Sequence, residues 1–158
     1  MGTIKASVPA SNITVEKWVD HILGDAKFNT PAAQGSAYAP SNIALSKYWG
    51  KREASFNLPV TGSVSISLAD HGTQTDLCII DGPKHQVSLN GKGLDASDGF
   101  VIKLSQWLDR VLPKNLKLGV DTINTVPTAA GLASSASGFA ALTLSTNSLM
   151  GWNLPQHQ

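Results

Sequence analysis

Residues 127–139, PTAAGLASSASGF, restrict the fold of this chain more than any other segment. Apart from one leucine, every residue between the proline and the phenylalanine is small, so the backbone can approach another backbone or a ligand closely. We expect this glycine- and serine-rich loop to open a final helix over roughly 134–150. The first N–H groups of a helix lack helical partners and lie at the positive end of its dipole. The segment therefore predicts a phosphate-binding helix entrance or, alternatively, only a close helix-packing contact.

A phosphate site at this entrance would depend on backbone N–H groups and serine hydroxyls. The sequence contains neither GxxxxGK[ST] nor GxGxxG, the common phosphate-binding patterns of other folds. Ser134, Ser135 and Ser137 supply hydroxyls instead. Such hydroxyls can donate to phosphate oxygens or help to hold Mg²⁺.

A cluster of cations forms a second informative segment. Two lysines, an arginine and two aromatic residues lie within residues 40–52, PSNIALSKYWGKR. In a strand, Lys47, Trp49 and Lys51 would share one face. Ammonium groups that face one cleft repel each other unless an anion lies between them, which favours a clamp for phosphate or carboxylate. The alternative is a solvent-exposed turn around a buried aromatic side chain.

The remaining patterns predict an α+β fold, with strands, a helix, a strand, a loop and a helix in that order. Residues 1–36 form an N-terminal extension with one short amphipathic helix, capped by Thr14 and ended by Gly24, before a linker over 25–36. Strands are predicted over 64–68 (half-buried), 75–80, 86–89 and 116–120, with a turn at 90–91. Helices are predicted over 100–111, with Ser97 as N-cap, and over 134–150. Asp70, Asp76 and Asp81 are expected at strand ends.

Charge and composition exclude several classes of partner. Twelve Lys and Arg residues against eleven Asp and Glu leave a formal charge of +1, so no basic excess favours nucleic acid or an anionic membrane. No apolar run of about 18 residues and no signal pattern occur, so we expect a cytoplasmic protein. The four histidines are far apart and Cys78 is the only cysteine. We therefore expect that these residues form no metal site. We also expect the histidines to be exposed and the thiol of Cys78 to be buried and unreactive.

Together, the two segments resemble the mevalonate-diphosphate decarboxylases of the GHMP kinase superfamily. PTAAGLASSASGF resembles the second motif of the superfamily, a phosphate loop used in place of a Walker loop. NIALSKYWGKR, then NLPVTGSVSISL, resembles the opening of the decarboxylases, and VSLNGK resembles the strand and turn that follow. The resemblance implies that residues 37–158 form the N-terminal domain of the two-domain GHMP fold, with a mixed or antiparallel sheet and helices packed on one face.

The resemblance also implies roles for individual residues. Lys47 matches a lysine near the reacting centre and is the catalytic candidate. The candidates for contact with the substrate are Tyr48, Trp49, Gly50, Lys51, Ser135 and Ser137. The candidates for contact with the phosphates of ATP are Gly131, Leu132, Ala133, Ser134, Ser135, Ala136, Ser137, Gly138 and Phe139.

The family reaction implied by the resemblance is an ATP-dependent decarboxylation. MgATP phosphorylates the 3-hydroxyl of mevalonate diphosphate, and loss of phosphate and carbon dioxide then gives isopentenyl diphosphate. We therefore expect ATP, Mg²⁺ and a small phosphorylated substrate. The aspartate of the family lies in a second half, beyond the position of Gln158, so we expect this chain to be inactive alone. The alternatives are a GHMP kinase such as mevalonate 3-kinase, or a non-catalytic nucleotide-binding module; a homodimer is left open.

Overall fold

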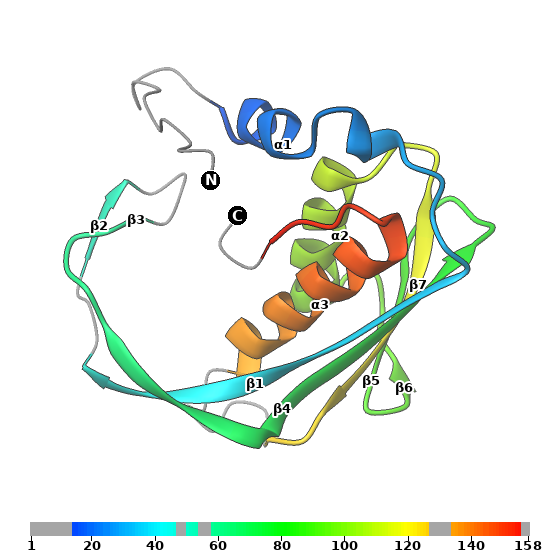
Figure 1. Ribbon diagram of the computed structural model, residues 1–158. Coiled ribbons are helices and arrows are strands. Elements are labelled where there is room, and N and C mark those ends of the chain that lie inside the picture. The colour runs from blue at the N-terminus through cyan, green and yellow to red at the C-terminus, as the bar shows by residue number, and fades with distance from the viewer. Residues whose placement is uncertain (1–13, 47–49, 54–57, 127–133, 156–158) are drawn as a thin grey trace.

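The computed structural model describes residues 14–46, 50–53, 58–126 and 134–155 (Figure 1). Within these residues the chain folds into an α+β structure, as predicted. The elements, in order, are α1 (Val15–Leu23), the 3₁₀ helix η1 (Gly24–Phe28), β1 (Gln34–Ser46), β2 (Lys51–Glu53), β3 (Leu58–Pro59), β4 (Val64–Ile80), β5 (Gln86–Leu89), β6 (Lys92–Gly93), α2 (Gly99–Val111), β7 (Lys117–Asn124) and α3 (Ser134–Met150).

A five-stranded mixed sheet forms the centre of the molecule. Its order is β1-β4-β7-β5-β6, and each pair is antiparallel except the parallel pair of β5 and β7. A parallel pair needs a crossover connection, which β6 and α2 provide. Figure 1 shows α2 and α3 over the same face of the sheet, while the opposite face stays open. The predicted mixed sheet with helices on one face is thereby confirmed.

The core lies between that face and the two helices. Helix α2 buries one stripe at helical spacing, as its apolar pattern predicted. The buried residues of the stripe are Val101, Leu104, Leu108 and Val111, and they pack with Leu77, Val87, Leu118 and Val120 of the strands. The N-cap of α2 differs from the prediction, because Asp98, not Ser97, accepts from the N–H of Phe100, at 2.7 Å. The hydroxyl and N–H of Ser97 instead bind Asp95.

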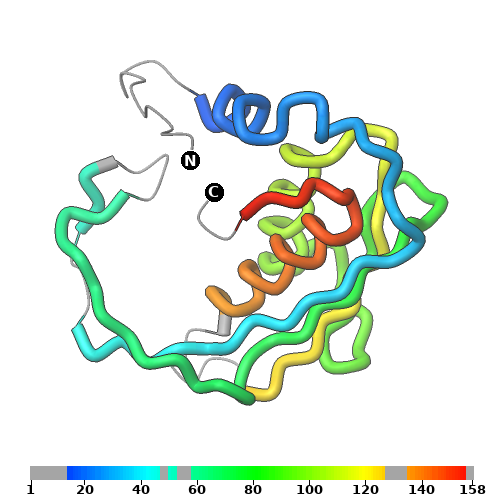
Figure 2. Tube along the Cα trace, in the orientation of Figure 1, coloured from blue at the N-terminus to red at the C-terminus, as the bar shows by residue number. Residues whose placement is uncertain are grey.

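Residues 25–36, which were predicted as a linker, are attached to the rest of the fold. Helix α1 is capped by Thr14 and ends at Gly24, as predicted, and η1 follows at once. Figure 2 shows the chain passing from α1 across the end of α2 into β1. The amide of Ala32 donates to the carbonyl of Leu149 at 2.7 Å. The side chain of Asn29 donates to the backbone carbonyl of Gly151. These bonds attach the predicted linker to the end of α3, and β1 begins at residue 34, inside that range.

Strand β4 joins two strands that were predicted as separate. It runs from residue 64 to 80 and bends at Ala69, whose φ of 48° is left-handed. The hydroxyl of Tyr38 donates to the carbonyl of Ala69 at 2.7 Å and holds the bend. Asp70 and Asp76, which were expected at strand ends, therefore lie inside one strand.

Beyond this bend β1 and β4 continue as a two-stranded arm, residues 42–46 and 64–67, that leads to β2 and β3 (Figure 1). The predicted half-burial of this part of β4 is wrong. Val64 is 61% exposed and Ile66 is 55% exposed, and Ile66 lies opposite the exposed Ile43. No contact in the described residues buries these side chains, because α2 and α3 cover the sheet and not the arm.

Candidate functional site

The predicted helix entrance begins where the sequence pattern placed it. Helix α3 starts at Ser134, so the amides of residues 134–136 lie in its first turn, where the helix offers them no acceptor. Its first turn carries no acidic residue that would repel an anion. The side chain of Ser135 is exposed and can reach a ligand. Residues 131–133 lie outside the described residues.

Ser137 faces inward from this turn. It is 3% exposed, and its hydroxyl accepts a hydrogen bond from the hydroxyl of Ser41 in β1 at 3.1 Å. A second hydroxyl contact, at 2.8 Å, joins it to Thr73 in β4. The entrance of α3 is thus hydrogen-bonded to two neighbouring strands.

The other end of α3 approaches β1 through a glycine. A Cβ added at Gly35 would lie 2.4 Å from the carbonyl oxygen of Ser145 and 2.7 Å from the Cβ of Leu149. Only glycine permits this separation without a shift of the helix. This contact lies outside residues 127–139, and an added Cβ at Gly138, inside that segment, meets nothing within 4 Å. The close-packing alternative for the start of α3 stays a prediction.

The lysine segment is described only in part. Lys51 is exposed and pairs with Pro59 between β2 and β3, and Gly50 has the left-handed φ of 81°. The candidates Lys47, Tyr48 and Trp49 lie outside the described residues. Figure 1 places β2 at the far end of the arm from the start of α3. The convergence of Lys51 with the helix entrance stays a prediction, and β1 is the element that connects the two segments.

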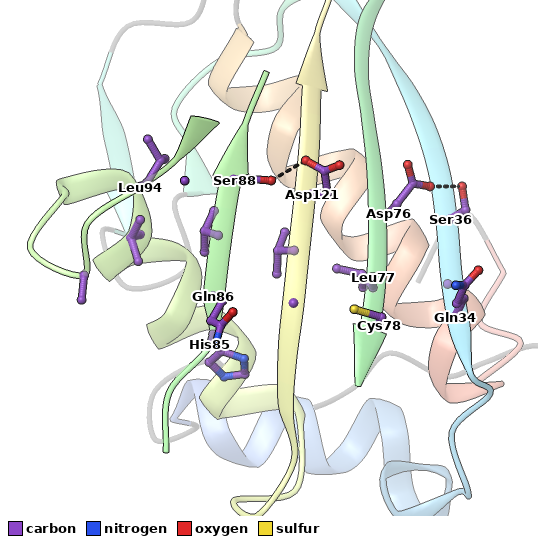
Figure 3. A pocket seen from close by; sticks show the side chains of 17 residues that line it. Gln34, Ser36, Asp76, Leu77, Cys78, His85, Gln86, Ser88, Leu94 and Asp121 are labelled. Carbon is purple, nitrogen blue, oxygen red and sulfur yellow. Dashed lines mark hydrogen bonds between the residues drawn. The ribbon is translucent and has the colours of Figure 1, made fainter. Parts of the chain in front are cut away.

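A cavity lies on the open face of the sheet, opposite α3 (Figure 3). It has a volume of about 680 Å³. Asp76 and Asp121 lie directly opposite each other on its floor, and they accept hydrogen bonds from Ser36 and Ser88 respectively. Two neighbouring carboxylates repel a phosphate. This face is therefore a poor location for the phosphorylated ligands that the two motifs suggest.

Cys78 also lies on this open face. It is exposed, so the expectation of a buried thiol is wrong. The apolar run around Cys78 suggested burial, but alternation along the strand turns its side chain away from the helices while Leu77 faces them.

His85 was missed, because the histidines were all expected at the surface. It is buried before β5, and its Nδ1 accepts from the amide of Leu118 at 3.1 Å. Its Nε2 lies 3.3 Å from Asp109, whose carboxylate also binds Lys117 at 2.6 Å. Burial holds the pKa of His85 below its ordinary value of 6.5, and Lys117 acts in the same direction, although the bond to Asp109 opposes both.

The carboxyl group of Asp109 responds to the same cluster. Burial alone would raise its pKa, but the hydrogen bonds from Lys117 and His85 outweigh burial and hold the pKa of Asp109 below 3.8. His85 is distant in the fold from the entrance of α3, since it joins β5, β7 and α2. We assign it to stability and not to the candidate site.

Comparison with known proteins decides the family. Residues 39–158 match the family model described as the diphosphomevalonate decarboxylase-like N-terminal domain. The chain belongs to this family. Diphosphomevalonate decarboxylase from Debaryomyces hansenii is 41% identical over 138 residues, which are 77% of this chain and 35% of the relative. The enzyme from Candida albicans is 42% identical over 135 residues, with coverage of 77% and 37%.

Solved structures of diphosphomevalonate decarboxylases share the fold. The Staphylococcus aureus enzyme aligns with a TM-score of 0.69 at 34% identity, over 78% of this chain and 38% of its own. A structure described as MDDEF in complex with MVAPP, AMPPCP and magnesium aligns with a TM-score of 0.64 at 34% identity, over the same shares. The fold is thus that of the GHMP type, and the chain spans about a third of the length of the relatives it matches.

The described residues contain no group of three or more His, Cys, Asp or Glu side chains that could hold a metal ion. None of the helices in the described ranges is long and apolar enough to cross a membrane.

Proposed function

We propose that this chain is the nucleotide- and substrate-binding part of an ATP-dependent decarboxylase that converts mevalonate 5-diphosphate to isopentenyl diphosphate. The family match over residues 39–158 carries this proposal, because it spans both the lysine segment and the helix entrance. A related structure that contains MVAPP, AMPPCP and magnesium supports the choice of ligands.

The entrance of α3 suits the phosphates of ATP. Amides of residues 134–136 in the first turn, together with residues 131–133 and 137–139, would surround them, and the helix dipole favours an anion there. Ser135 and Ser137 are the hydroxyl candidates of this turn. Ser135 is exposed, whereas Ser137 is already bonded to Ser41 and Thr73. Mg²⁺ would be held by phosphate and hydroxyl oxygens, which fits the lack of an acidic cluster in the described residues.

We assign the substrate to the lysine segment. Lys47 would lie near the reacting centre, and Lys51 would oppose the charge of the substrate diphosphate, with Tyr48, Trp49 and Gly50 beside them. The ammonium of Lys51 is on an exposed strand, where it can meet an anion. Two lysines near crowded phosphates lower the repulsion that otherwise opposes phosphoryl transfer.

In this reaction the residues would mainly position the two ligands and neutralise the charge of their phosphates. Transfer of the γ-phosphoryl group of ATP converts the tertiary 3-hydroxyl into a better leaving group. The C3–O bond then breaks, and the electron pair of the bond between C2 and the carboxylate carbon forms the new C2–C3 double bond, with release of carbon dioxide. The proton of the hydroxyl must go to a base, and we propose that this base lies outside residues 1–158.

Product analysis of the complete protein carrying this sequence tests the proposal. With mevalonate 5-diphosphate and MgATP, we expect ADP, phosphate, carbon dioxide and isopentenyl diphosphate in equal amounts. ADP without carbon dioxide would make the protein a kinase of the same superfamily. Nucleotide binding without any ADP would make it a binding module. The cytoplasmic location, and the choice between monomer and homodimer, stay predictions from the sequence.

A further inference from the structure

A chain of buried hydroxyl groups connects the entrance of α3 to the sheet. It joins Ser41 of β1, Ser137 of α3 and Thr73 of β4, at 3.1 Å and 2.8 Å. Thr73 also bonds to the side chain of Asn124 at the end of β7, at 3.3 Å. Ser41 and Thr73 are each only 1% exposed. Buried hydroxyl groups are costly unless they are bonded, so each bond fixes the positions of its two partners.

The three hydroxyls belong to three different elements. The oxygen Oδ1 of Asn124 can only accept, so the proton of that bond comes from Thr73. Ser137 accepts from Ser41 and also contacts Thr73, so its hydroxyl is bonded to both strands.

Other buried hydroxyls of α3 behave differently. Ser145 and Thr146 are fully buried, but each donates to the carbonyl of Leu142 in its own helix. Such bonds do not connect the helix to the sheet. The close approach at Gly35 holds the far end of α3 against β1. The bonds of Ser137 attach the near end of α3 to β1 and β4.

We propose that Ser41 and Thr73 are positioning residues for the phosphate-binding entrance. Through Ser137 they fix the rotation of the first turn of α3 and so aim the amides of residues 134–136 at the phosphates. This inference rests on the proposed function, since it assigns those amides to a nucleotide. It identifies β1 as the element that sets the entrance and also leads into the lysine segment.

Four variants of the complete protein separate positioning from plain stability. Ser41→Ala and Thr73→Val remove the bonds between helix and sheet. Ser145→Ala and Thr146→Val are matched controls, because they remove buried hydroxyls of α3 that bond only within the helix. Two quantities are measured under conditions in which every variant is folded. One is the affinity for Mg²⁺ and AMPPCP by calorimetry, and the other is hydrogen exchange at the amides of residues 134–137 without nucleotide.

We expect Ser41→Ala and Thr73→Val to bind AMPPCP about three- to tenfold more weakly, as the loss of one hydrogen bond would allow, and to exchange faster at these amides. The two controls should match the wild type in both measurements, even if they unfold more easily. Wild-type affinity and exchange in Ser41→Ala and Thr73→Val would overturn the inference and leave the proposed function intact. If the wild type binds no nucleotide even when mevalonate 5-diphosphate is present, the proposed function is contradicted, and hydrogen exchange alone then decides whether the two residues hold the entrance.

Discussion

At the scale of single residues, the imidazole of His85 is held in one neutral form. The amide of Leu118 can only donate, so Nδ1 of His85 carries no proton, and its Nε2 donates to Asp109. A second proton on Nδ1 would oppose the amide of Leu118. The folded protein therefore resists protonation of His85, in agreement with its lowered pKa.

Stability should consequently fall in mild acid. The unfolded chain binds a proton at His85 near pH 6.5, before the folded chain does, so the free energy of unfolding decreases as the pH falls from 6.5 through the folded pKa.

Urea unfolding at about pH 7.5 and about pH 5.5 checks this prediction. His85→Gln should show a smaller loss between the two conditions than the wild type, and the exposed His71→Gln should behave as the wild type does. An equal loss in His85→Gln would assign the effect to other groups. Asp109 does not contribute in this range, because its stabilisation is lost only as the pH falls below 3.8 and through its folded pKa.

Lys51 offers a second test at this scale. In the complete protein, Lys51→Ala should weaken the binding of mevalonate 5-diphosphate by about 1.5–3 kcal/mol, the range for a hydrogen bond to a charged group. Titration calorimetry with the substrate measures this change. Lys114→Ala, an exposed lysine between α2 and β7, is the control and should bind normally. Unchanged affinity in Lys51→Ala would remove this lysine from the substrate site.

At the scale of secondary-structure elements, the contact between α3 and β1 depends on Gly35. Gly35→Ala should destabilise the fold by about 1–3 kcal/mol, because the new methyl group meets the helix backbone and a shift of α3 must relieve the overlap. Gly93→Ala is the control, since nothing lies within 4 Å of an added Cβ there. Urea unfolding of the two variants measures the difference. Equal stability would show that α3 moves away from β1 at little cost.

Elements with a regular apolar period could be predicted from the sequence. The buried stripe of α2 is such an element, and the ranges expected for β5 and α3 also agree with their bounds. The Asn90-Gly91 turn has left-handed φ values at both residues. Features that depend on partners distant in the sequence could not. The bend at Ala69 needs the hydroxyl of Tyr38, and the burial of His85 needs α2 and β7 around it. Neither partner is visible from the local sequence.

The candidate site was likewise predictable only where it depends on the local sequence. The glycine- and serine-rich segment predicted a helix entrance because its small residues form a loop in front of the helix expected over 134–150. The inward bonds of Ser137 to Ser41 and Thr73 were not predicted, because these residues are 96 and 64 positions away in the sequence. Local spacing indicates which residues start the helix, but only the fold determines which hydroxyl faces the sheet.

At the scale of the whole molecule, the arm of β1 and β4 exposes an apolar face. Ile43, Leu45, Val64 and Ile66 are all exposed. An exposed patch of this kind favours association. The double variant Ile43→Thr/Ile66→Thr should reduce self-association of the 158-residue chain, with a change in stability of no more than about 1 kcal/mol, because a cross-strand pair contributes little.

Light scattering over a range of protein concentrations measures the self-association. Ile123→Thr is the matched control, since Ile123 is equally exposed but lies on β7, away from the arm. We expect the control to associate as the wild type does. If the double variant also associates as the wild type does, the arm is not the surface responsible.

A crystal structure of the complete protein with Mg²⁺, AMPPCP and mevalonate 5-diphosphate tests the assignment of the site most directly. We expect the phosphates of AMPPCP within hydrogen-bond distance of the amides of residues 134–136, with Lys51 beside the diphosphate of the substrate. Phosphates bound on the open face near Asp76 and Asp121, or an entrance of α3 without any phosphate, would contradict the proposed site.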